Sequence, residues 1–197
     1  MFNDLSSPLS LLETRRSGRP RDLVAPGPSP DELRRILAVA ARTPDHGKLH
    51  PWRFVHVAQD RRAGFADLLR RAYLAGNPDA GRLELEAGDR FAHQAPELVV
   101  ALSTPVVPHK IPLWEQQLSC GAACMNLLIA AHAMGYAAGW VTGWAAYSPI
   151  VVESFGATGD HDRIAAFIFL GTPGAEQEER PRPDYDDVVG EWTPQSA

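Results

Sequence analysis

The longest stretch without charge lies between Glu115 and Glu153, where the chain has no Asp, Glu, Lys or Arg. A solvated helix is not expected to run this far without a charged side chain, so most of the stretch should be buried. The segment Trp114 to Gly143 therefore predicts a buried helix that leads into a buried strand. Small residues at three- and four-residue spacing would let a second helix, which could be a partner's copy, approach closely; they are Ser119, Ala122, Ala123, Asn126, Ala130 and Ala133.

An uncharged stretch of this length is also a candidate membrane span. Asn126 and His132 would then lie in hydrocarbon, glycines would interrupt the helix, and no Lys or Arg cluster flanks the segment closely. We therefore interpret the stretch as the central core helix of a globular protein.

Shorter patterns predict the other elements of the chain. Ser29 as N-cap, Pro30 at the first helical position and Glu32 at the capping-box position mark the start of one helix. The expected helices cover about residues 8–13, 30–41, 60–74, 79–92 and 148–155, and the expected strands cover 52–58, 97–102, 136–142 and 163–170.

The last residues differ in composition from the rest of the chain. From Gly174 onward Glu, Pro, Arg and Asp dominate with almost no apolar pattern, which is typical of an extended arm rather than a core segment. Val188, Val189 and Trp192 could anchor its end. We expect one domain over residues 1–173, with 174–197 as an arm of the same domain.

Composition limits the classes of function. Of 197 residues 45% are hydrophobic and 22% charged, and the net charge of −5 argues against a nucleic-acid partner. Cys120 and Cys124 form neither a CxxC pair nor a disulfide framework, and the N-terminus lacks the pattern of a secretory signal. These features predict a cytoplasmic protein with small buried thiols.

Sequence motifs argue for or against a metal site, a hydrolase and the common nucleotide folds. Asp45, His46, His50 and His56 could suggest a metal site, but the HExxH arrangement needs a helix, and Pro44, Gly47 and Pro51 argue against one here. No G-x-S-x-G, P-loop or G-x-G-x-x-G pattern occurs, and Cys120 lies inside the expected buried helix. A hydrolase and the common nucleotide folds are therefore disfavoured.

Cationic and hydrogen-bonding side chains gather on three irregular segments. Arg offers a planar fork to an anion and Ser offers a hydroxyl donor, so the pattern suits phosphate recognition. Solvated surface charge remains an equal alternative at this point. The residues are Arg15, Arg16, Ser17 and Arg19; then Arg42, His46, Lys48 and His50; then Arg180 and Arg182.

Four segments in order along nearly the whole chain together resemble the FMN-dependent nitroreductase family, and most closely its short-chain, YdjA-type branch. They are TRRSGR from Thr14, ARTPDHGKLHPWRF from Ala41, the Trp114 to Trp140 stretch with Glu115, Asn126 and Gly135, and LGTP from Leu170. The resemblance implies a three-layer α+β fold with a central mixed sheet flanked by helices. It also implies a homodimer that exchanges the C-terminal arm and holds FMN at two interface sites.

The family pattern assigns roles to individual residues. It places Arg15, Arg16 and Ser17 around the FMN phosphate and ribityl chain, and Arg19 toward the pyrimidine edge. Backbone groups after Trp140 would lie near flavin N5 and O4. The full implied cofactor-binding set is Arg15, Arg16, Ser17, Arg19, Arg42, His46, Lys48, Trp140, Val141, Thr142, Gly143 and Arg182, with Arg180 less strongly implied. Arg19 and Lys48 could also tune the flavin potential.

Two departures from the family pattern fall near the expected flavin. Asp45 and the Lys48 to His50 run stand where many members have Ser and Asn-x-Gln, and Val141 stands where the short branch can carry Arg. The resemblance implies hydride transfer from NADH or NADPH to a nitroaromatic, quinone or similar acceptor by a ping-pong mechanism, without a nucleophilic side chain. Two alternatives stay open: a flavin-binding or regulatory protein without turnover, and a small-anion or metal-dependent hydrolase that needs no flavin.

Overall fold

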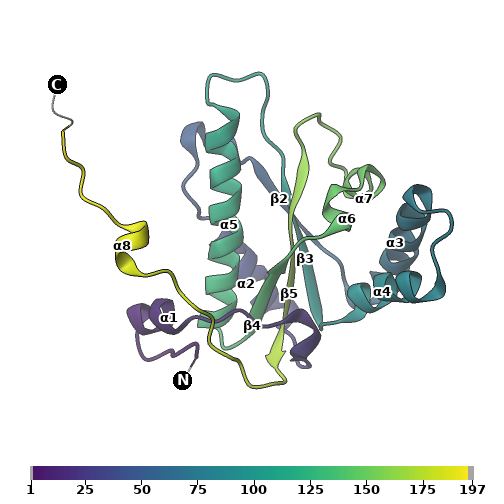
Figure 1. Cartoon of the computed structure of the whole chain (residues 1–197), viewed down its shortest axis with the longest axis horizontal. Helices are drawn as coiled ribbons and strands as arrows, with labels where there is room; N and C mark the ends of the chain where they lie inside the picture. Colours follow the sequence, from purple (N-terminus) through teal and green to yellow (C-terminus); the bar gives the residue numbers. More distant parts are fainter. Residues whose placement is uncertain (1, 195–197) are drawn as a thin grey trace.

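A computed structural model describes residues 2–194 of the chain (Figure 1). These residues form a five-stranded sheet in which β5 (Arg163–Pro173) is central. The strand β3 (Glu97–Ser103) pairs with one edge of β5, and β2 (Trp52–His56) lies outside β3. The other edge of β5 carries β4 (Ala137–Val141) and the short β1 (Leu23–Val24).

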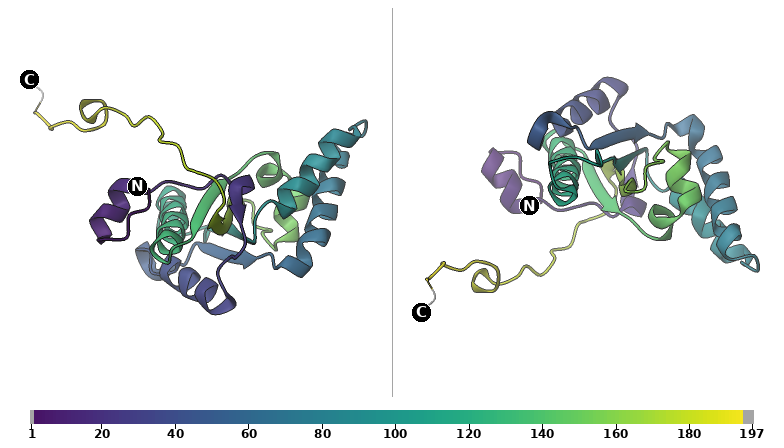
Figure 2. Two further views of the ribbon diagram at one scale, coloured as in Figure 1. Left: turned by 90° about the horizontal axis from the view of Figure 1, so that it is seen from below. Right: turned by 90° about the horizontal axis from the view of Figure 1, so that it is seen from above.

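Side chains that alternate in direction along the strands form two hydrophobic cores, one on each face of the sheet. In β5, Phe167 and Phe169 join one cluster of buried residues, whereas Ile168 and Leu170 join the other. This is the period of two expected for a strand buried on both faces. Helices α2 (Pro30–Ala40) and α5 (Leu113–Ala133) cover one face, and α3 (Arg62–Gly76), α4 (Arg82–His93), α6 (Trp144–Tyr147) and α7 (Pro149–Ser154) cover the other (Figure 2).

The three-layer α+β architecture confirms the predicted fold class. All four strand pairings within residues 2–194 are antiparallel, so the sheet is not mixed within the described part of this chain. The four expected strands and six expected helices are present, including the capping box of Ser29 and Glu32. The sequence analysis missed β1, α6 and the single turn α8 (Tyr185–Val188), all of them too short to show a period.

The central helix α5 corrects one interpretation. Ala123 and Ala130 lie in the chain's own core beside the sheet, whereas Ala122 and Ala133 face outward. The small residues therefore do not form one stripe for a second helix, because α5 turns part of them toward its own sheet. Its outward face instead carries the exposed Trp114 and Leu118. No helix of the described residues is sufficiently long and apolar to cross a membrane.

The chain ends share one side of the molecule. Helix α1 (Pro8–Thr14) leads into the basic segment, and residues 174–182 return across that segment after β5 (Figure 1). Residues 183–194 then extend away from the body, with Val188 and Trp192 exposed rather than anchored within this chain. Residue 1 and residues 195–197, the outer ends of the predicted domain and arm, lie outside the described residues.

Candidate functional site

The basic segment after α1 lies against the open edge of β4. The backbone N–H of Gly18 donates to the carbonyl oxygen of Ala138 over 3.1 Å. A Cβ atom at Gly139 would collide with the Gly18 carbonyl oxygen and contact Pro20, so only glycine permits this close approach. The sequence therefore fixes the position of the Arg15 to Arg19 segment relative to the strand.

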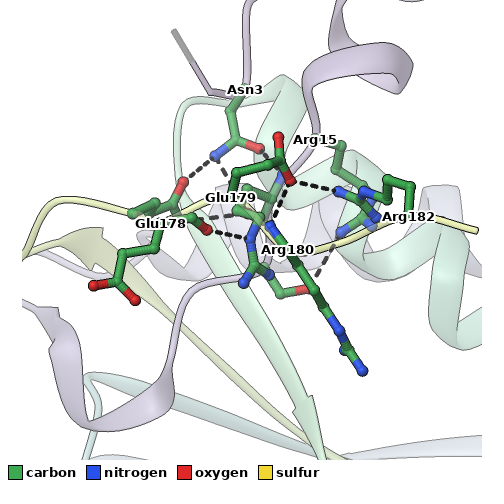
Figure 3. Close-up of polar contacts among 9 residues, drawn as sticks. Asn3, Arg15, Glu178, Glu179, Arg180 and Arg182 are labelled. Carbon is green, nitrogen blue, oxygen red and sulfur yellow. Dashed lines mark hydrogen bonds and ion pairs between the residues drawn. The ribbon is translucent and has the colours of Figure 1, made fainter.

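Three arginines converge at this edge. The Nη1 atom of Arg15 donates to Ser17 Oγ over 3.2 Å. Burial of its side chain, and next the neighbouring charges of Arg182 and Arg16, lower the pKa of the Arg15 guanidinium. Figure 3 shows Arg15 and Arg182 side by side although they come from opposite ends of the chain. Like charges held this close create a site that favours an anion.

The returning C-terminal residues complete the cluster. Arg16 Nε donates to the carbonyl oxygen of Glu178 over 2.7 Å, and Arg19 Nη2 pairs with the Glu178 carboxylate at 3.1 Å. Arg182 Nη2 pairs with Glu179 at 3.4 Å. The structure thus brings Arg15, Arg16, Ser17 and Arg182 together, and Arg19 joins them through Glu178. The side chain of Arg180 points away from Arg15 (Figure 3).

The same edge of β4 continues beyond the contact with Gly18 to Trp140 and, after the strand ends, to Thr142. The directions of the backbone N–H and C=O groups alternate along an antiparallel strand, so Trp140 turns these groups to the side that Ala138 offers to Gly18. Thr142 follows the last residue of β4, about 13 Å from Ala138 along the direction of the strand. The Trp140 indole donates to Ala165 O over 3.1 Å, and Val141 packs against the core.

A cavity of about 360 Å³ opens at this end of β4. Thr142 and Gly143 line it together with aromatic side chains of the helices on that face, and the rings of Tyr73 and Trp144 meet edge to face at 5.0 Å. Leu69 of α3 and Phe91 of α4 form its far wall. The sequence analysis missed these wall residues, because helical periodicity marks an inward face but not what that face meets.

The loop between α2 and β2 lies away from the basic cluster, against α5. Asn126 Nδ2 donates to Thr43 Oγ1 over 2.7 Å, Ser119 Oγ donates to Pro44 O over 2.6 Å, and His46 Nδ1 meets Glu115 Oε2 at 2.7 Å. These contacts attach the loop to the first two thirds of α5.

The basic cluster lies near the opposite end of α5. There the buried His132 has a pKa lowered to about 4, first by burial and next by the charge of Arg15. Ser119 and His132 are about 20 Å apart along the helix. Within one chain the structure therefore does not bring Arg42, His46 and Lys48, which the loop carries, to Arg15.

The former candidates for metal ligands have other partners. The Asp45 carboxylate accepts the backbone N–H of His50 over 2.7 Å, and His56 Nε2 meets Glu97 Oε2 at 2.6 Å. Among residues 2–194 no group of three or more His, Cys, Asp and Glu side chains is arranged to hold a metal ion.

Comparison with known proteins identifies the family. Residues 12–172 match the model of the nitroreductase family. The chain belongs to this family. A Haemophilus influenzae protein named "Putative NAD(P)H nitroreductase" is 38% identical over 174 residues, which cover 87% of this chain and 91% of that protein. The Escherichia coli K12 protein named "Putative NAD(P)H nitroreductase YdjA" is 34% identical over 165 residues, 84% and 87% of the two chains.

Solved structures support the nitroreductase fold. A nitroreductase-like family protein from Bacillus cereus superposes with a TM-score of 0.78 at 19% identity, covering 94% of this chain and 95% of the other. The NADPH:FMN oxidoreductase from Vibrio harveyi, complexed with NAD⁺, gives a TM-score of 0.71 at 18% identity and covers 96% and 79%. At these identities the likeness concerns the fold alone.

Proposed function

We propose that this protein binds FMN along the open edge of β4 and uses it to pass a hydride from NAD(P)H to a nitroaromatic, quinone or similar acceptor. Membership of the nitroreductase family makes it an FMN-dependent oxidoreductase that uses NAD(P)H. The observation that carries the site assignment is the convergence of Arg15 and Arg182 beside Ser17. Among residues 2–194 no ion pair occupies Arg15, so its charge is available to a phosphate.

The geometry of the edge fits an elongated ligand with one anionic end. The phosphate would lie against Arg15, Ser17 and Arg182. The ring system would extend along β4 to the backbone of Thr142 and Gly143, where the cavity begins. Arg19, on the same segment, would place its charge toward the pyrimidine edge.

The bound flavin supplies the hydride chemistry, and the chain supplies binding, orientation and charge. A cation beside the pyrimidine edge favours the electron-rich state of the ring, so Arg19 would raise the flavin potential. The aromatic walls of the cavity would exclude water and support planar acceptors. One stacking face would serve NAD(P)H and the acceptor in turn, which gives parallel double-reciprocal plots; intersecting plots would contradict a shared face.

The proposal includes a homodimer. The outward face of α5 exposes Trp114, Leu118 and Ala122 to solvent in the single chain. An isologous contact between two antiparallel α5 helices would cover this face. It would also bring the loop of one copy, with Arg42, His46 and Lys48, to the basic cluster near the far end of the partner's α5. The extended residues 183–194 would lie on the partner, and the free thiols Cys120 and Cys124 suit a reducing cytoplasm.

Flavin binding by variants tests the site. Replacing Arg15 with Ala should weaken FMN binding about thirtyfold, because one charge-assisted contact contributes ~2 kcal/mol. Arg182→Ala should act in the same direction. The exposed Arg34→Ala on α2 makes the same charge change away from the site and should leave affinity unaltered. Equal FMN affinity in wild type and in the Arg15→Ala, Arg182→Ala double variant would contradict the assignment, and NAD(P)H oxidation separates an enzyme from a flavin carrier.

A further inference from the structure

The C-terminal segment 175–178 lies over part of the basic cluster, at Arg16, Ser17 and Arg19. Together with Arg16, Ser17 and Arg19 it lines a small pocket of about 30 Å³, which does not include Arg15 or Arg182. Gln177 holds this segment in place, since its side chain donates to Arg16 O over 3.3 Å and accepts from Asn3 Nδ2 over 3.1 Å. A flavin ring is larger than this pocket, so its edge would reach Arg19 there only if residues 175–178 moved.

Two neighbouring carboxylates, those of Glu178 at the end of this segment and of Glu179 after it, pair with arginines that the proposed function assigns to the cofactor. Glu178 pairs with Arg19 at 3.1 Å, and Glu179 pairs with Arg182 at 3.4 Å. In Figure 3 the Glu179 carboxylate lies beside Arg182, whereas the side chain of Glu178 points away from the labelled arginines. Each carboxylate therefore fills part of the cationic surface and would repel an arriving phosphate of nearly two negative charges.

We propose that Glu178 and Glu179 are internal competitors for the cofactor site, and that FMN enters by displacing them from Arg19 and Arg182. This inference rests on the proposed function. The two glutamates would lower the affinity of the site for any anion and would couple cofactor loading to a rearrangement of residues 175–179. They would then set the affinity for FMN without contributing a contact to it.

The exposure of these ion pairs shows why displacement is feasible. The paired side chains are 60% and 78% exposed for Arg19 and Glu178, and 53% and 64% for Arg182 and Glu179. Solvent-exposed pairs of this kind contribute less than a factor of about five each to an equilibrium. The carboxylates thus tune the affinity of the site and do not block it.

The two glutamates should differ in which part of the ligand they oppose. Glu179 holds Arg182, which is assigned to the phosphate, whereas Glu178 holds Arg19, which is assigned to the ring. Riboflavin has the ring and lacks the phosphate. Glu179→Gln should therefore raise the affinity for FMN by a factor of about two to five and leave that for riboflavin unaltered, while Glu178→Gln should raise both.

These affinities are measured by titrating the purified full chain with FMN or riboflavin and following the quenching of flavin fluorescence. The matched control is Glu191→Gln, which makes the same charge change on the same arm at a residue outside the ion pairs described. Affinity for FMN in the Glu178→Gln, Glu179→Gln double variant that equals or falls below that of the control would overturn the proposal. A riboflavin gain in Glu179→Gln equal to its FMN gain would also overturn it.

A second probe separates this inference from the proposed function. Inorganic pyrophosphate, titrated calorimetrically, reports the anion site without any flavin. If the wild type binds no FMN, the proposed function fails, but Glu179→Gln must still raise pyrophosphate affinity above that of the Glu191→Gln control. If FMN binds and the pyrophosphate affinities of these two variants are equal, the competitor role fails alone.

Discussion

The Nη1 atom of Arg62 lies 2.8 Å from the carbonyl oxygen of Ala92, which joins the start of α3 to the last turn of α4. Arg62 is 1% exposed and also donates to the carbonyl oxygens of Val57 at 2.7 Å and Pro96 at 3.2 Å. It thereby satisfies acceptors that the end of α4 leaves without helical partners. This buried guanidinium fixes α4, and with it Phe91, at the wall of the cavity.

Arg62→Met should therefore destabilise the fold by about 3 kcal/mol or more, because several buried carbonyl groups lose their donor. Urea unfolding should show a lower midpoint with an unchanged slope. Its neighbour Arg61 is largely exposed and pairs with the exposed Asp60, so Arg61→Met should stay within about 0.5 kcal/mol of wild type. Equal effects of the two substitutions would show that the buried bonds do not stabilise the protein.

The contact between Gly139 and the Gly18 carbonyl gives a second prediction. Gly139→Ala should push the basic segment off β4, with a cost of about 1 to 3 kcal/mol in stability and a matching loss of FMN affinity. Gly64→Ala adds the same methyl group on α3, where nothing lies within 4 Å, and should stabilise the helix by up to about 1 kcal/mol. Unaltered FMN binding in Gly139→Ala would separate the segment from the cofactor site.

The lowered pKa of His132 leads to a prediction of how the stability of the fold depends on pH. Its buried ring donates from Nδ1 to Tyr136 O over 3.1 Å, and burial with the Arg15 charge lowers its pKa to about 4. The unfolded chain has the ordinary pKa of about 6.5 and takes up the proton first, so stability should be lost as pH falls from about 6.5 to about 4. The loss is on the order of 3 kcal/mol. His132→Phe should flatten this part of the profile, whereas exposed His161→Gln should not.

Substitutions on the two faces of α5 should change different properties of the protein. Leu118→Arg changes the exposed face and should yield a folded monomer with reduced flavin content if two copies pair there. Ala123→Trp overfills the core against the sheet and should lower the free energy of unfolding by about 1 to 3 kcal/mol or more. Light scattering and flavin absorbance on one sample provide the measurement. A Leu118→Arg monomer with full flavin occupancy would contradict a shared site.

The sequence by itself determined the features encoded in neighbouring residues. The capping box at Ser29, the uncharged helix from Trp114 and the alternation of β5 follow from local hydrogen bonds and from the period of burial. These signals need no knowledge of distant residues. The predicted segments were therefore confirmed with small changes at their ends.

Only the tertiary structure decided which residues meet. Nothing within a few positions of Arg182 indicates that its charge lies beside Arg15, or that Glu178 pairs with Arg19. Periodicity likewise gave α5 an apolar character but not its orientation, so Ala123 was assigned to the wrong face. Contacts across more than a hundred residues depend on how the sheet and helices pack together, and local physical chemistry carries no record of that packing.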